Sequence, residues 1–158
     1  MINIQPSHSN VITAKENTMI GALIAKSKVT SSYDLLNNRD IKSFLANWHD
    51  ESTFVFPGNI SASGEFKGKK AIEEFFLKLL DQFPTFKITP KNVCVKNLLD
   101  FVGTNVVTVE WIEENINKGG NNVRVSGVTV ITLKFGKATH AIDYIFNTDE
   151  ELRQAWGE

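Results

Sequence analysis

Apolar residues recur at three- and four-residue spacings in two parts of the chain, which is the pattern of helices with one buried face. The first stripe covers residues 33–48 and is broken by the polar residues 37–40, which suit a helix end followed by a new helix cap. The second stripe covers residues 71–80 and is closed by Pro84. We therefore expect two helices in tandem, with Trp48 on the second, and one further helix.

Strand-like alternation dominates the second half of the chain. It predicts four long strands joined by a Gly/Asn-rich loop at 117–122 and a tight turn at Gly136-Lys137, then a short helix opened by a capping box at Thr148. The strands are expected at residues 87–96, 104–113, 123–135 and 138–146, with a shorter one at 52–57. This order predicts an α+β fold in which a strongly curved antiparallel sheet wraps around the N-terminal helices as a cone.

The first 29 residues carry no comparable pattern. We expect residues 1–29 to be a partly mobile leader and residues 30–158 to be one domain. The apolar residues 19–25 suit either a short helix or a strand that pairs with a partner.

Composition adds three points to this picture. The 158 residues carry a formal net charge of −1, which gives little electrostatic reason to expect nucleic acid or an anionic membrane as partner. No apolar run approaches the roughly 20 residues that span a bilayer. Eleven Phe and three Trp against two Tyr predict an aromatic interior.

Metal and disulfide chemistry find little support. Cys94 is the single cysteine, so an internal disulfide or a thiolate metal cluster is excluded, and the three histidines lack zinc-site spacing. We expect neither a metal nor a cofactor. Lys15 and Glu16 stand where a secretory signal needs an apolar core, so a cytoplasmic location is expected by default.

Three stretches are similar to a known family. They are residues 33–41 (YDLLNNRDI), residues 56–72 with the pieces FPGN and SGEFKGKKAI, and residues 136–144 (GKATHAIDY). Over residues 30–158 the chain resembles the nuclear transport factor 2-like (NTF2-like) superfamily, and within it SnoaL-like polyketide cyclases and ketosteroid isomerase-like proteins. The resemblance implies the cone-shaped, cystatin-like fold. It leaves function open, because this fold hosts cyclases, isomerases, dehydratases, hydrolases and non-catalytic subunits.

One catalytic position of the family is matched. SnoaL-like cyclases use an aspartate on the last strand as general acid/base, and Asp143 stands there, although the histidine that often precedes it by two residues is Ala141. Ketosteroid isomerases place a carboxylate where Phe56 stands and a proton-sharing carboxylate near Thr129. Epoxide-hydrolase-like members need an arginine that strand residues 107–111 lack. The resemblance therefore implies a catalytic role for Asp143 alone.

The strand pattern supports the same residue. Asp143 shares one strand face with Ala141 and Ile145, and if that face lines the cone, desolvation will raise its pKa toward neutrality. The alternatives are that Asp143 faces solvent or is a structural acid bonded to a neighbouring strand.

Aromatic and hydroxyl residues are candidates for the ligand-binding wall. Each also has a plain structural interpretation as core packing, and for Tyr33 we expect helix packing with a surface hydroxyl. The candidates are Tyr33, Trp48, Phe54, Phe56, Trp111 and Thr129.

Two function classes follow. The first is a cofactor-independent cyclase or isomerase, in which Asp143 moves a proton on a small, apolar, carbonyl-bearing or cyclic substrate. The second is a non-catalytic ligand-binding or dimerisation module of the same fold. In both cases we expect a homodimer formed through the outer sheet face, where Thr and Val alternate over residues 123–134.

Overall fold

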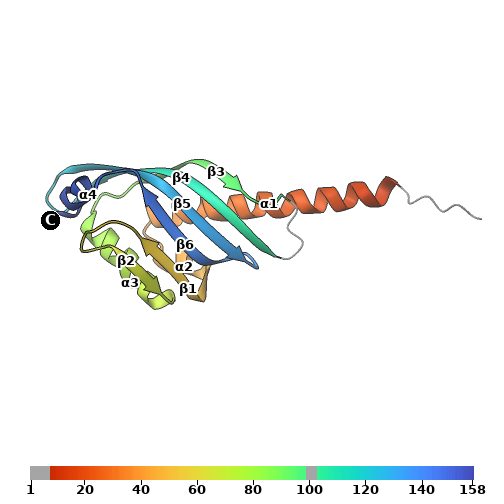
Figure 1. Cartoon of the computed structure of the whole chain (residues 1–158), viewed down its shortest axis with the longest axis horizontal. Helices are drawn as coiled ribbons and strands as arrows, with labels where there is room; N and C mark the ends of the chain where they lie inside the picture. Colours follow the sequence, from red (N-terminus) through yellow and green to blue (C-terminus); the bar gives the residue numbers. More distant parts are fainter. Residues whose placement is uncertain (1–7, 99–102) are drawn as a thin grey trace, which may run out of the picture.

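The computed structural model describes residues 8–98 and 103–158, with side chains from residue 21 onward. In this part of the chain four helices and six strands follow one another, as Figure 1 shows. They are α1 (His8–Asn37), α2 (Ile41–Ala46), β1 (Trp48–Phe56), β2 (Gly64–Lys67), α3 (Lys69–Gln82), β3 (Ile88–Val95), β4 (Thr104–Ile116), β5 (Asn122–Lys134), β6 (Lys137–Ile145) and α4 (Asp149–Trp156).

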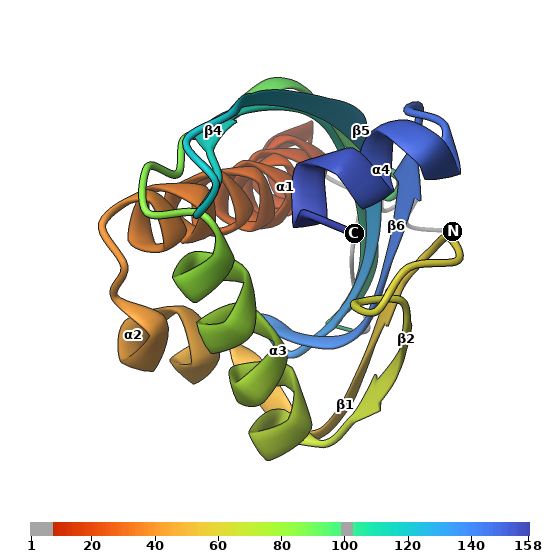
Figure 2. The same ribbon diagram turned by 90° about the vertical axis from the view of Figure 1, so that its left-hand side faces the viewer.

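The strands form one curved, open sheet in the order β2-β1-β6-β5-β4-β3. Viewed end-on, the sheet curls around α1, with α3 on its open side and α4 across one end (Figure 2). The predicted α+β fold is confirmed. Two details differ, because β1 pairs with β6 in parallel and the short strand β2 was not expected.

Long-range pairing determines where α2 ends. The helix stops at Ala46, and Trp48 opens β1 opposite Ala138, so the expected helical position of Trp48 is wrong. Phe44 and Trp48 are four residues apart, and this spacing continues the helical stripe. The Ala138 backbone N–H instead donates to the Asn47 carbonyl at 2.8 Å, which draws the chain into the sheet.

The start of α2 and the β5–β6 turn are both explained by the residues at these corners. Asp40 caps α2 by accepting a hydrogen bond from the Ser43 backbone N–H at 3.0 Å. The β5–β6 turn has φ angles of 49° at Phe135 and 75° at Gly136, the left-handed pair that a two-residue hairpin needs. The turn lies one residue earlier than expected.

Helix α1 passes through the expected boundary between leader and domain. Residues 19–25 are helical, so the strand alternative for them is wrong, and the first turns of α1 project beyond the sheet in Figure 1. Residues 1–7 of the expected leader lie outside the described residues, and the boundary at residue 30 stays a prediction. Across residues 8–98 and 103–158, no helix combines the length and apolar character that crossing a membrane requires.

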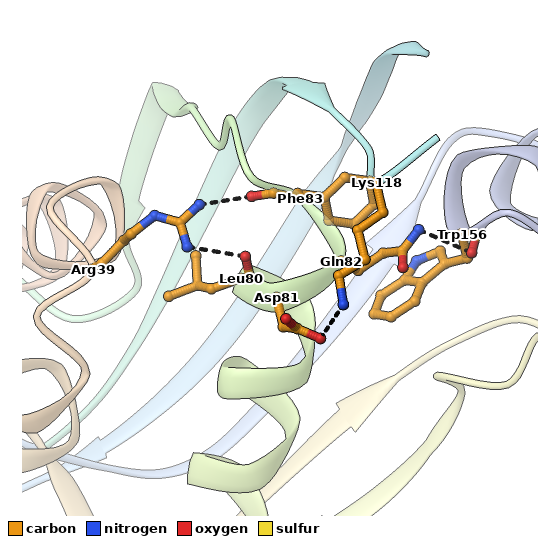
Figure 3. A network of polar contacts seen from close by, with 7 residues as sticks. All are labelled: Arg39, Leu80, Asp81, Gln82, Phe83, Lys118 and Trp156. Atoms are coloured by element: carbon orange, nitrogen blue, oxygen red, sulfur yellow. Dashed lines mark hydrogen bonds and ion pairs between the residues drawn. The ribbon is translucent and has the colours of Figure 1, made fainter. Parts of the chain in front are cut away.

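The C-terminal end of α3 is tied to three other parts of the fold (Figure 3). The Arg39 guanidinium donates to the carbonyls of Leu80 at 2.9 Å and Phe83 at 2.8 Å, which satisfies groups that a helix end leaves unpaired. Gln82 donates to the carbonyl of Trp156 at 3.0 Å, and an ion pair joins Asp81 to Lys118. These contacts join the end of α3 to the α1–α2 corner, to the β4–β5 loop and to α4.

Candidate functional site

A cavity of about 100 Å³ lies between α1, α3 and the concave face of the sheet. This is room for several water molecules or a small organic group, since one water needs roughly 10–15 Å³ on the same measure. All seven residues expected at the site line it, namely Tyr33, Trp48, Phe54, Phe56, Trp111, Thr129 and Asp143.

One wall of the cavity is a packed aromatic cluster. The Phe76 ring lies 4.7 Å from Phe44 and 5.3 Å from Phe54, centroid to centroid, and Phe54 lies 5.0 Å from Phe75. These are ordinary aromatic contacts of a protein core. The same rings therefore pack in the core and form the cavity wall, two roles that the sequence had left as alternatives.

The opposite wall carries a chain of hydrogen bonds across three strands. The Trp111 indole N–H donates to Thr129 Oγ1 at 2.8 Å, and the Thr129 hydroxyl donates to Asp143 Oδ1 at 2.6 Å. An indole N–H can only donate, so the Thr129 oxygen is the acceptor and its single hydrogen is free for Asp143.

Gly127 makes this arrangement possible. It pairs with Trp111 in the β4–β5 register, and Trp111 lies over it so closely that a Cβ at Gly127 would be 2.9 Å from Trp111 Cζ2. The same Cβ would be 2.5 Å from the backbone oxygen of Tyr144. A side chain here would displace the indole from Thr129.

Asp143 projects into the cavity. It retains some accessible surface, which the cavity accounts for, and the buried Ala141 lies beside it on the same strand face. Burial raises the pKa of Asp143 to about 7, against the opposing effect of the Thr129 hydrogen bond. The solvent-facing alternative is thus wrong, whereas the cross-strand bond to Thr129 is present.

Tyr33 lies deeper than expected. Its side chain is buried, with its hydroxyl within hydrogen-bonding reach of Thr129, so the expected surface hydroxyl is wrong. Burial raises the pKa of Tyr33 well above its usual range, and the charges of Asp143 and Glu113 add to this. Tyr33 therefore stays a neutral phenol in the cavity wall.

Glu113 is a second cavity carboxyl that the sequence interpretation missed. Burial raises its pKa to about 8, and the charge of Asp143 adds to the effect. Because the charge of one carboxyl disfavours ionisation of the other, the two groups do not readily ionise together. The sequence pattern could have predicted this position, because Glu113 continues the strand face that carries Val107, Val109 and Trp111.

The exposed end of the cavity lies near the β5–β6 turn. Lys28 and Gly136 are both exposed lining residues there, and the Lys28 ammonium would be 3.2 Å from a Cβ placed on Gly136. Half-buried Ser32 and Asn47 also line the cavity. A ligand entering at this end would pass polar groups before it reached the aromatic rings.

Within the described segments, no three His, Cys, Asp or Glu side chains gather as metal ligands.

The chain matches the SnoaL-like domain family over residues 29–141, which is more than half of its length. It therefore belongs to the SnoaL-like family of the NTF2-like superfamily, as the sequence predicted. The matched segment ends two residues before Asp143. None of the curated proteins compared with the chain matches it.

Solved structures share the fold at low identity. An NTF2-like protein from Burkholderia pseudomallei is 15% identical with a TM-score of 0.71, covering 85% of this chain and 98% of its own. An isomerase candidate from Bacillus subtilis is 20% identical with a TM-score of 0.70 and coverages of 87% and 95%. RV0760c from Mycobacterium tuberculosis, solved with estradiol-17β-hemisuccinate, is 22% identical with a TM-score of 0.65 and coverages of 82% and 95%. These findings support a small-molecule-binding SnoaL-like protein.

Proposed function

We propose that the protein binds a small, mostly apolar ketone in the cavity and moves a proton on it, with Asp143 as general acid/base. Removal of a proton beside the carbonyl gives an enol or enolate, which then closes a ring or isomerises. No cofactor is needed for such a step. The observation that carries the proposal is the position of Asp143, whose carboxyl lies in an aromatic-walled cavity with a pKa raised to about 7.

The arrangement around Asp143 suits this task. The Thr129 hydroxyl holds Oδ1 at 2.6 Å and is itself oriented by the Trp111 indole, so the second carboxyl oxygen keeps a fixed direction. A base with a pKa near the working pH combines a usable ionised fraction with enough basicity to take a proton. The solved complex of RV0760c with an estradiol derivative supports a ring-shaped ligand for this fold.

Proton exchange of a simple ketone tests the proposal. We expect the wild-type protein to exchange the α-protons of 2-tetralone for deuterium in deuterated water, followed by proton NMR. Asp143→Asn should reduce the protein-dependent rate by at least about 10²-fold, the usual contribution of a general base. Asp34→Asn, which changes an exposed aspartate on α1, is the matched control and should keep the wild-type rate.

The other outcomes each decide against the proposal. A wild-type protein that binds 2-tetralone without exchanging its protons is a non-catalytic binding module, the alternative drawn from the sequence. Equal exchange rates in Asp143→Asn and wild type would place the chemistry elsewhere. Absence of binding would contradict an apolar ketone as ligand.

We also propose that two copies pair through the outer face of the sheet. Thr129 points into the cavity, so its neighbours Val128 and Val130 lie on the outer face, where both are half-buried. Tyr144 is 53% exposed and lies opposite Val128 in the β5–β6 register. A partner covering these side chains would remove an apolar surface from water.

A further inference from the structure

Glu113 is a titratable cavity residue that the proposed function leaves without a task. It follows Trp111 on the inward face of β4 and lines the same cavity as Asp143. The titratable groups lining that cavity are Lys28 and Tyr33 from α1, Glu113 from β4 and Asp143 from β6.

Asn115 holds one oxygen of Glu113. The buried Asn115 accepts a hydrogen bond from the Lys87 backbone N–H through Oδ1 at 3.0 Å. A backbone N–H can only donate, so this bond fixes the orientation of the amide and directs Nδ2 toward Glu113. Asn115 Nδ2 then donates to Glu113 Oε2 at 3.0 Å. A proton carried by Glu113 therefore belongs on Oε1.

Asp143 is held in the same manner. Its Oδ1 accepts from Thr129, whose oxygen already accepts from Trp111. A proton carried by Asp143 therefore belongs on Oδ2. Each of the two carboxyl groups has one oxygen held by a donor of fixed orientation and one oxygen left to carry the proton.

The pair has no cationic partner in the described part of the chain. None of the ion pairs found there includes Glu113 or Asp143, and the Lys28 ammonium lies beside Gly136 at the exposed end. Tyr33 stays neutral. Burial and mutual repulsion therefore make the doubly ionised pair unfavourable, so the pair retains one proton. When Asp143 is the ionised member, as the proposed function requires, that proton is on Glu113.

We propose that Glu113 is the acid partner of Asp143: it delivers its proton to the carbonyl oxygen of a bound enolisable ketone while the Asp143 carboxylate removes a proton from the adjacent carbon. The inference rests on the proposed function and adds the residue that protonates the carbonyl oxygen. The C–H electron pair becomes the C=C bond of the enol, and the carbonyl π pair forms the O–H bond with the Glu113 proton.

The step balances without an oxidant or reductant. Asp143 ends neutral and Glu113 ends ionised. Return of the enol proton to Glu113, together with delivery of the Asp143 proton to the α-carbon, restores both groups and the ketone, and this is the exchange reaction. In a β,γ-unsaturated ketone, delivery of the Asp143 proton to the γ-carbon of the dienol gives the conjugated isomer.

The exchange of 2-tetralone protons tests Glu113 separately from Asp143. We expect Glu113→Gln to lower the rate about 10²-fold and to remove the decline of the rate at alkaline pH, which reports loss of the Glu113 proton. The control Glu114→Gln changes the neighbouring exposed residue, which pairs with Arg124, and should match wild type. If Glu113→Gln keeps the rate and the alkaline decline while Asp143→Asn abolishes exchange, the role of Glu113 is overturned and the proposed function stands.

A second measurement does not depend on a folded Glu113 variant or on activity. Carbon-13 NMR of labelled glutamate side chains in the wild-type protein should show Glu113 titrating with a pKa of about 8. In Asp143→Asn this value should fall, because the repelling charge is gone. Titration of Glu113 near the ordinary value of 4.5, or no change in Asp143→Asn, would overturn the proposal.

Discussion

At the residue scale, the site consists of two carboxyl groups in apolar surroundings, each oriented by a neighbour on the sheet. Asp143 was found through its place on the last strand, and the alternation predicted that it shares one face with Ala141 and Ile145. That this face lines the cavity came only from the structure. The same alternation could have predicted Glu113 on the inward face of its strand, but Glu113 matches no catalytic position of the family. The Trp111–Thr129 bond was not predictable, since it depends on the β4–β5 register that places Trp111 opposite Gly127.

The raised pKa values predict how stability depends on pH. The folded protein holds protons on Asp143 and Glu113 up to about pH 7 and 8, whereas the unfolded chain loses them near 3.8 and 4.5. The contribution of these two carboxyl groups to the free energy of unfolding should therefore be greatest below pH 4, fall as pH rises through this window, and level off above pH 8.

Denaturant unfolding between pH 4 and pH 9 measures this effect. Asp143→Asn or Glu113→Gln should remove a decline on the order of 4–5 kcal/mol each, since burial raises each pKa by more than three units and one unit corresponds to about 1.4 kcal/mol. Asp34→Asn should keep the wild-type profile. A variant whose stability falls with pH as steeply as wild type would contradict the burial of that carboxyl.

At the element scale, the sequence predicts best those helices and strands that are determined by residues close together in the chain. The terminal helix α4 begins where its capping box predicts, because Thr148 and Glu151 bond within one turn. The alternation also predicted strands β4 and β5, although β4 continues to Ile116, three residues beyond its expected end. Strand β2 has four residues, and its register comes from pairing with β1, so no local pattern marks it. The parallel pairing of β1 with β6 is likewise a property of the folded sheet.

At the scale of the whole molecule, the aromatic surplus has a structural explanation. The aromatic residues fill one side of the cone and leave a small cavity, with the two carboxyl groups on the sheet wall and Lys28, Ser32 and Asn47 at its exposed end. The outer face of the sheet remains partly apolar, and this is the surface that we propose for dimerisation.

Light scattering at micromolar concentration tests the dimer. The wild-type mass should be twice the 17.7 kDa of the chain. Val130→Asp should give monomers, because a charge would be desolvated at the interface. Leu77→Asp, at a 51% exposed position on α3, is the control and should remain dimeric. A wild-type mass of one chain, or a dimeric Val130→Asp, would contradict this interface.

The pKa of Asp143 tests the central claim most directly. Carbon-13 NMR of labelled aspartate side chains, followed against pH, should show one carboxyl titrating at about 7 that is absent from Asp143→Asn. Such a value would place the carboxyl in the cavity in the state that proton transfer near neutral pH requires. Titration of Asp143 near the ordinary value of 3.8 would contradict the account, because the group would then be ordinary, solvated and weakly basic.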